Sequence, residues 1–195
     1  MNSPAAHYRG YSDLTRSQFE GIDFRIQVRS KAASPVAVIA PHGGGIEEYT
    51  SEIARAIAGE DFNLYLFEGV RQAGNFASLH LTSHRFDEPR CVNLLSNCDH
   101  VVAVHGCAGD RQEVLVGGLD EALKSAIAGS LSAIGVATLL TGHRFPAIDP
   151  NNICNRGRRG AGVQIEMTTA LRFQGPHEPI CAAVRSVLAA LPQTS

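Results

Sequence analysis

The chain has 195 residues, of which 44% are hydrophobic and 18% are charged, and its formal net charge is −2 at pH 7. A chain of this length and composition can bury a full hydrophobic core, which excludes intrinsic disorder for most of it. The small net charge favours neither nucleic acid nor an anionic membrane as a partner, and every apolar run is far shorter than the ~20 residues of a membrane span. We therefore expect one domain over 1–195, frayed at 1–10 and 192–195.

The N-terminal segment and the cysteines indicate the cellular compartment. The first ten residues lack the basic segment followed by an apolar segment that marks a signal peptide, so we expect a cytoplasmic location. The chain has five cysteines and no CxxC pair. An odd number of cysteines without a secretory signal favours reduced thiols over a disulfide framework.

The first half of the chain predicts three strands and two helices. Apolar residues alternate with polar ones at 22–28, which indicates a half-exposed strand at the edge of a sheet. Continuous apolar runs at 36–40 and 64–67 are typical of strands that are covered on both faces. Helical spacing of apolar residues predicts a helix that begins near Thr50 and a second one from Asp87 to about Asn97.

The second half continues the alternation of strands and helices. Asp120 is a good N-cap for a helix whose apolar residues extend to Ile134, and a second helical pattern covers 180–191. Continuous apolar runs predict four further buried strands, at 101–104, 114–116, 136–140 and 163–165. Short buried strands that alternate with amphipathic helices predict an α/β fold, with a mostly parallel or mixed central sheet flanked by helices.

Residues able to carry out chemistry follow directly after four of the buried runs. These residues are His42, Glu68, His105 and Glu166. The carboxyl ends of parallel strands meet at one edge of a sheet, and ligand sites form there. We therefore expect two histidines and two glutamates to lie together at this edge.

The segment from His42 to Glu47 contains three consecutive glycines, which allow the backbone to turn tightly between the two side chains. With His105 they form a set of two histidines and one glutamate, which is a ligand set of catalytic zinc sites. A nearby carboxylate must accept a proton from water at such a site, and Glu166 is our candidate. Glu68 is either a partner for the second nitrogen of a metal-bound histidine or a turn residue.

Other interpretations of these motifs are weaker. The glycine-rich turn could hold a phosphate or form the oxyanion loop of an esterase, but the chain has neither a GxxxxGK[ST] or GxGxxG motif nor a GxSxG motif. Cys107 could be a nucleophile next to His105, yet residues two apart on a strand point in parallel, a poor geometry for proton transfer. Cys107 and Cys154 are better explained as small packing residues.

A polar, basic loop at 149–160 leads into the strand that carries Glu166. Arginines there could bind substrate carboxylates or stabilise an oxyanion, or the loop could be an ordinary solvated turn. We predict substrate contacts from four residues of the loop, which are Arg156, Asn155, Arg158 and Arg159. Four further polar residues cannot be distinguished from ordinary surface positions: His80, His84, Arg85 and His143.

Taken together in chain order, these motifs resemble the phage-type poly-γ-glutamate hydrolases. The resemblance covers roughly residues 20–172 and rests on seven segments: 42–47, 66–69, 79–83, 105–107, 116–118, 152–155 and 162–166. The chain departs from the family at Glu48-Tyr49-Thr50, where members often carry Pro-Gly before the threonine.

The resemblance implies a zinc-dependent hydrolase of γ-glutamyl amide bonds with a compact fold similar to that of zinc carboxypeptidases. It places one Zn²⁺ on His42, Glu47 and His105, makes Glu166 the catalytic carboxylate, and implies an acidic peptide or a small molecule as substrate. Two alternatives stay open: a metal-dependent amidase or carboxypeptidase for other acidic peptides or N-acyl amino acids, and a non-catalytic ligand-binding α/β protein. A structural zinc normally has four protein ligands, and the sequence offers no convincing fourth.

Overall fold

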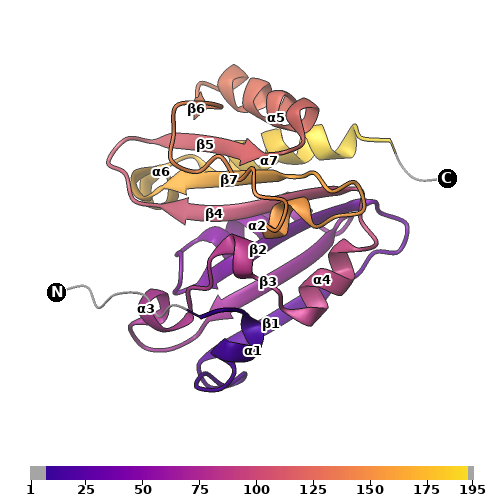
Figure 1. Ribbon diagram of the computed structural model, residues 1–195. Helices are drawn as coiled ribbons and strands as arrows, with labels where there is room; N and C mark the ends of the chain where they lie inside the picture. The colour runs from indigo at the N-terminus through magenta and orange to yellow at the C-terminus, as the bar shows by residue number, and fades with distance from the viewer. Residues whose placement is uncertain (1–7, 193–195) are drawn as a thin grey trace.

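The computed structural model describes residues 8–192, which form a seven-stranded sheet in the order β1-β3-β2-β4-β7-β5-β6 (Figure 1). The central strands β3, β2, β4 and β7 run parallel, while β1 is antiparallel to β3 and β5 is antiparallel to β7. The sheet is therefore mixed and mostly parallel, as the sequence predicts. The strands are β1 (Phe24–Arg29), β2 (Val36–Gly44), β3 (Asn63–Gly69), β4 (His100–Cys107), β5 (Glu113–Gly118), β6 (Ala137–Leu139) and β7 (Val163–Thr168).

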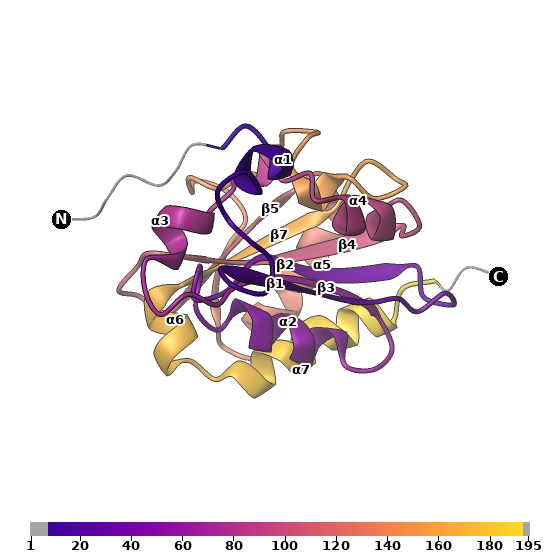
Figure 2. The same ribbon diagram turned by 90° about the horizontal axis from the view of Figure 1, so that it is seen from below.

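Helices cover both faces of the sheet. The helices are α1 (Tyr11–Leu14), α2 (Thr50–Ala58), α3 (Asn75–Leu79), α4 (Pro89–Leu95), α5 (Glu121–Ala133), α6 (Thr169–Gln174) and α7 (His177–Ala189), with short 3-10 turns η1 (Ser83–Arg85) and η2 (Ile153–Asn155). Figure 2 shows α2 and α7 beneath the sheet and α1, α3 and α4 above it. Buried residues of α2, α5 and α7 form one core with the sheet, and those of α1, α3 and α4 form the other.

Burial on both faces explains the continuous apolar runs of the central strands. In β2, Val36 and Val38 belong to the core beneath the sheet, while Ala37 and Ile39 belong to the core above it. Successive side chains of a strand point to opposite faces, so a strand between two cores needs apolar residues at every position. The edge strand β1 has exposed and buried positions, and this explains its alternating sequence.

The helix starts follow local capping chemistry. The helix α2 begins at Thr50 as predicted, and α5 begins after Asp120, whose side chain accepts a hydrogen bond from the Leu123 N–H. The helix predicted from Asp87 to about Asn97 is α4, which begins two residues later, at Pro89, with Glu88 as its N-cap. Asp87 instead accepts a hydrogen bond from the backbone N–H of Tyr11.

The predicted fraying of both ends falls largely on 1–7 and 193–195, which lie outside the described residues. Tyr8 and Gly10, within the segment expected to fray, are tied to the domain. The Tyr8 hydroxyl donates to the carbonyl of Ser78 at 3.0 Å, and the Gly10 carbonyl accepts from the Leu14 N–H at 3.1 Å. Across 8–192, every helix is too short or too polar to cross a bilayer.

Candidate metal centre and its cavity

The loop from His42 to Glu47 brings its two end side chains together at the carboxyl end of β2. Gly44 has a φ of 60°, in the left-handed region, and a Cβ there would lie 2.5 Å from the Gly69 carbonyl oxygen. The Glu47 N–H donates back to the His42 carbonyl at 2.9 Å, which closes the loop. The tight glycine turn inferred from the sequence therefore returns the carboxylate to the imidazole.

His42, Glu47 and His105 meet as the sequence predicts. His42 Nδ1 lies 2.9 Å from Glu47 Oε1 and 3.1 Å from His105 Nδ1, and His105 Nδ1 lies 3.4 Å from Glu47 Oε2. A tetrahedral ion with bonds of about 2.0–2.2 Å separates its ligand atoms by about 3.3–3.6 Å. The three side chains are 8% exposed or less, and the closest pair of donor atoms, 2.9 Å apart, must separate slightly to hold one ion.

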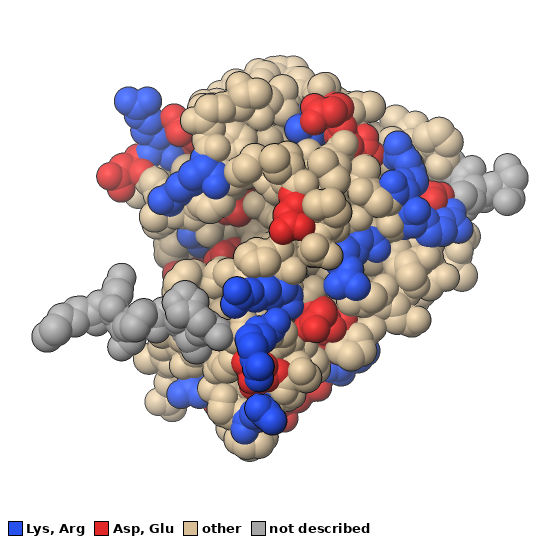
Figure 3. All heavy atoms as spheres, in the orientation of Figure 1, with Lys and Arg blue, Asp and Glu red and all other residues tan. Residues whose placement is uncertain are grey.

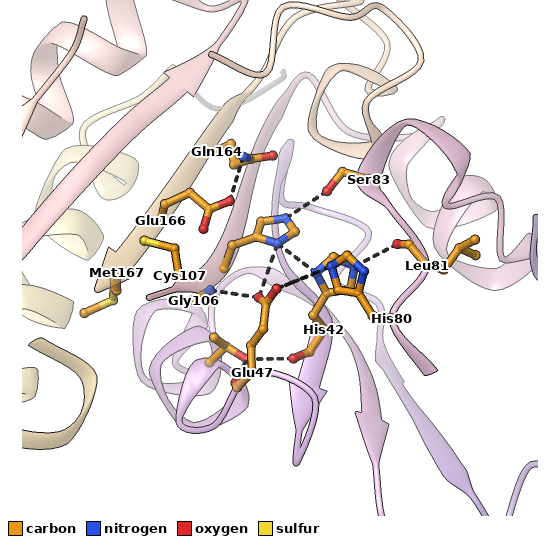
Figure 4. Close-up of polar contacts among 12 residues, drawn as sticks. His42, Glu47, His80, Leu81, Ser83, Gly106, Cys107, Gln164, Glu166 and Met167 are labelled. Atoms are coloured by element: carbon orange, nitrogen blue, oxygen red, sulfur yellow. Dashed lines mark hydrogen bonds and ion pairs between the residues drawn. The ribbon is translucent and has the colours of Figure 1, made fainter. Parts of the chain in front are cut away.

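Each donor atom is oriented by a second contact. His42 Nε2 lies 2.8 Å from the Leu81 carbonyl, and His105 Nε2 lies 3.5 Å from the Ser83 hydroxyl. A proton held on Nε2 by these acceptors leaves Nδ1 free to bind a metal. The Gly106 N–H donates to Glu47 Oε2 at 2.8 Å (Figure 4).

The role suggested for Glu68, as partner of a metal-bound histidine, is wrong. Its carboxylate accepts hydrogen bonds from Arg25 at 2.7 Å and from Arg55 at 3.0 Å. Both partners come from the strand and helix that pack beside β3. Glu68 therefore ties β1 and α2 to the sheet, and the sequence could not show this because the pairing depends on strand order.

His80 is a fourth candidate donor that the sequence could not single out. Donor atoms of His42, Glu47 and His80 lie within 4.8 Å of one another, and His80 Nε2 is 3.8 Å from Glu47 Oε1. Its ring stacks on that of His42, with 4.2 Å between centroids. His80 follows α3, a helix of five residues, and so short an element has no periodic pattern that would place His80 at the site.

The charges of the cluster suit a cation site. Burial opposes ionisation of Glu47, but His42 and His105 hold the pKa of its carboxyl well below its usual range. Burial lowers the pKa of His80 to about 3, with His42 adding to the effect, so His80 is neutral at physiological pH. A neutral imidazole and an ionised carboxylate are the forms that bind metals. Burial lowers the pKa of His105 but Glu47 raises it above its usual value, so a metal must displace a proton from His105.

Glu166 lies beside the cluster, opposite His105 in the register of β4 and β7. Its Oε1 accepts a hydrogen bond from Gln164 Nε2 at 2.9 Å, and Gln164 Oε1 accepts one from Asn152 at 3.0 Å. Burial raises the pKa of the Glu166 carboxyl to about 7, although His105 opposes the rise. Gln164 lies two residues before Glu166 in an apolar strand, so both side chains point to the same face. This spacing could have predicted the contact between them from the sequence.

A cavity of about 940 Å³ opens over the cluster. His42, Glu47, His80, His105 and Glu166 all line it. Figure 3 shows this face hollowed to the left of its centre, between the regions that Figure 1 labels β4 and α3, with acidic and basic atoms visible inside.

The structure does not bring the four predicted substrate-binding residues of loop 149–160 into the lining of this cavity. Asn155 is buried and donates to the Ala147 and Asp149 carbonyls. Arg158 pairs with Asp99 and Arg159 pairs with Asp120, while Arg156 is half-buried outside the lining. Two other arginines, Arg144 and Arg172, line the cavity instead.

All five cysteines have free thiols and are buried. Cys107 lines the cavity near Glu166, and burial raises the pKa of its thiol to about 11. A thiol with so high a pKa is protonated at neutral pH and is a poor nucleophile.

The fold and site define a class of protein. Two histidines, a glutamate and a second carboxylate are grouped in a cavity at the carboxyl ends of parallel strands, which is a candidate metal site of a kind that hydrolases use. Residues 8–176 match the family described as Poly-gamma-glutamate hydrolase, and the chain belongs to that family.

Curated relatives come from Bacillus subtilis (strain 168). UPF0714 protein YndL is 38% identical over 167 residues, which cover 85% of this chain and 65% of YndL. SPbeta prophage-derived UPF0714 protein YoqZ is 39% identical over 139 residues, which cover 70% of this chain and 50% of YoqZ. The chain thus spans about half to two thirds of the length of these two relatives.

Solved structures show the same fold. A structure of a bacteriophage poly-gamma-glutamate hydrolase has a TM-score of 0.88 and 32% identity, covering 93% of this chain and 96% of that one. A structure described as zinc-free apo YndL has a TM-score of 0.86 and 32% identity, covering 94% of this chain and 97% of that one. An N-formylglutamate amidohydrolase from Ralstonia eutropha JMP134 (TM-score 0.56, 11% identity, 85% and 95% coverage) shares the fold alone.

Proposed function

We propose that this chain is a zinc-dependent hydrolase of γ-glutamyl amide bonds, with one zinc ion held by His42, Glu47 and His105. The observation that supports it best is the mutual spacing of the three donor atoms, 2.9–3.4 Å, in a cavity large enough for a peptide. The substrate class is supported by membership of the family, and the metal by the description of the YndL structure as zinc-free.

The residues of the chain divide the chemistry among them. A zinc ion in such a site acidifies water and polarises a carbonyl, lowering the pKa of water from 15.7 to about 7. Glu166 takes the proton from the attacking water and gives it to the leaving amine nitrogen, because a carboxyl with a pKa of about 7 can do both near neutral pH. Gln164 holds the Glu166 carboxylate in place through its amide.

Hydrolysis of γ-linked oligoglutamate by the purified, zinc-loaded chain tests this function. We expect release of free amino groups from the γ-linked substrate and much slower release from an α-linked oligoglutamate of equal length. His42→Ala should abolish both activity and bound zinc. Equal cleavage of α-linked or N-acyl substrates would replace the γ-glutamyl assignment with a broader acidic amidase. A zinc-free wild type with full activity would refute the metal mechanism.

A non-catalytic, ligand-binding protein with a closed structural metal is the second candidate, and His80 is the observation that favours it. Four protein donors are the usual set of a structural zinc site, and His80 brings the count of nearby donors to four. Membership of the poly-gamma-glutamate hydrolase family and the Glu166 carboxylate beside the cluster favour the catalytic arrangement, in which a fourth position is left for water.

A further inference from the structure

The cavity contains an exposed arginine, Arg144, that forms no ion pair with a carboxylate of residues 8–192. Most Lys and Arg side chains of the chain pair with a carboxylate. Within residues 8–192, the arginines that form no ion pair are Arg85, Arg144, Arg156 and Arg172. Arg144 and Arg172 line the cavity, whereas Arg85 and Arg156 do not.

Arg172 is already engaged by the protein itself. It is buried, and its guanidinium donates to the Met167 carbonyl at 3.1 Å and to the Glu48 carbonyl at 2.6 Å. A guanidinium held in this way has few donors left for a ligand. Arg172 is therefore part of the cavity wall.

Arg144 is different, because its guanidinium donates no hydrogen bond to any of residues 8–192. The side chain is exposed, and its guanidinium carbon lies 4.9 Å from the centroid of the Phe145 ring. Stacking on a ring face leaves the N–H groups at the edge of the guanidinium plane available to a carboxylate. Burial raises the pKa of Glu166 and of Cys107, and the charge of Arg144 opposes both rises, so Arg144 lies within electrostatic reach of the proposed reaction centre.

The loop that carries Arg144 is held to the sheet. Just before it, His143 Nε2 lies 3.2 Å from the Val116 carbonyl. Just after it, the Gly118 N–H donates to the Pro146 carbonyl at 2.9 Å. Gly117 allows this approach, because a Cβ there would collide with the backbone carbonyls of Phe145 and Pro146.

Asn155 fixes the far end of the same loop. Its Nδ2 donates to the Ala147 carbonyl at 2.8 Å and to the Asp149 carbonyl at 3.0 Å. Its Oδ1 accepts from the Gly162 N–H at 3.1 Å. A loop that is anchored on both sides can present a charge at a fixed place, which keeps the entropy cost of binding low.

We propose that Arg144 binds a carboxylate of the substrate beside the scissile bond and thereby makes the cavity specific for acidic amides. This inference rests on the proposed function. In γ-linked glutamate each residue carries a free carboxylate on its α-carbon, one carbon away from an amide nitrogen of the main chain. A guanidinium fork that lines the same cavity matches such a carboxylate, and binds it equally in the ground state and the transition state.

Arg144→Gln in the zinc-loaded full chain tests the inference, because it keeps much of the side chain and removes the charge. A hydrogen bond to a charged group contributes about 1.5–3 kcal/mol, so we expect KM for a γ-linked oligoglutamate to rise roughly 10- to 100-fold. The kcat and the zinc content should stay close to those of the wild type. Arg111→Gln is the matched control, since the Arg111 side chain is 87% exposed outside the cavity.

A substrate whose α-carboxylates are converted to primary amides completes a double-mutant cycle. The wild type should lose about the same factor on this substrate, and Arg144→Gln should not distinguish the two substrates. Equal KM values for Arg144→Gln, Arg111→Gln and wild type would overturn the inference while leaving the proposed hydrolysis intact.

Equilibrium binding of a labelled γ-linked oligoglutamate to Glu166→Gln tests the carboxylate site independently of hydrolysis. If Arg144→Gln weakens this binding while the wild type hydrolyses no substrate, the carboxylate site is supported and the proposed hydrolase function is refuted. Binding that Arg144→Gln does not weaken would overturn the carboxylate site.

Discussion

The choice between His105 and His80 as the third metal ligand can be tested by zinc-dependent thermal stability. His105 Nδ1 lies 3.1 Å and 3.4 Å from the donor atoms of His42 and Glu47, close to the edges of a tetrahedral site. His80 Nε2 lies 3.8 Å from Glu47. We therefore expect His105→Ala to remove most of the stabilisation that zinc gives to the fold, and His80→Ala to retain it.

The size of the effect follows from linkage and chain length. Free zinc at 100 times its dissociation constant stabilises the folded state by about 2.7 kcal/mol. At about 2.1 cal/mol/K per residue, a chain of 195 residues unfolds with an entropy near 0.4 kcal/mol/K at its midpoint. The expected rise in Tm is therefore about 7 °C for the wild type.

Differential scanning fluorimetry of the chelator-treated protein, with and without added zinc, measures this shift. His80→Ala should keep more than two thirds of the rise, and His105→Ala should keep less than one third. His84→Ala is a suitable control, because His84 is exposed and lines the cavity without belonging to the donor cluster. The opposite ranking would show that His80 is the ligand, and equal partial losses would favour a closed four-ligand site.

Three further predictions concern single side chains. Glu166→Gln should retain zinc and lower kcat by about 10²- to 10⁴-fold, the usual share of general base catalysis, and an unchanged kcat would refute its role. Glu68→Gln should lower the free energy of unfolding by about 1.5–3 kcal/mol in urea titrations. Burial opposes ionisation of Glu68 but Arg25 lowers its pKa, so this difference should be complete above the unfolded pKa of about 4.3 and vanish as pH falls through the lower folded pKa. Tyr49 has a φ of 71°, so Tyr49→Gly should relieve about 1 kcal/mol of strain and offset the lost contact with Phe173, whereas Tyr49→Val should lower Tm more.

The fold was largely predictable because its strands lie between two cores. A strand covered on both faces needs an unbroken apolar run, and five of the predicted runs are the strands β2, β3, β4, β5 and β7. The sixth run, at 136–140, was wrongly predicted to be buried, because β6 is an edge strand whose residues are exposed or half-buried. The missed elements are α1, α3 and α6, which have four to six residues each. Helices of this length are stabilised by what they pack against, so their own sequence carries no 3.6-residue period long enough to recognise.

Tyr49 shows how tertiary contacts replace a local signal. A glycine would adopt a positive φ freely at this position, and in this chain a tyrosine adopts it instead. The ring of Tyr49 packs edge-on against Phe173, 4.9 Å between centroids, and lies near His177. Contacts with α6 and α7 therefore stabilise the positive φ that a glycine would adopt without such contacts, and α2 still begins at Thr50.

The site residues that the sequence could predict lie on strands, and those that it could not predict lie on loops. His42, His105 and Glu166 end the parallel strands β2, β4 and β7, which are neighbours in the sheet. For such a residue, its place at the carboxyl end of a strand predicts the edge of the sheet at which it lies. The alternation of side chains along the strand predicts the face of the sheet to which it points, so the sequence predicts that these residues lie together.

No comparable rule governs the loops. His80 reaches the cluster from the segment after α3, and Arg144 reaches the cavity from a loop whose course depends on the Asn155 amide and on Gly117. Loop 149–160 is richer in arginine than loop 140–149, and on composition alone it is the better candidate for binding an acidic substrate. The arginines of loop 149–160 with carboxylate partners are neutralised by Asp99 and Asp120, whereas Arg144 has no such partner within residues 8–192. Pairing within the fold thus decides which arginine is left for a ligand, and it is a property of the folded chain that composition does not contain.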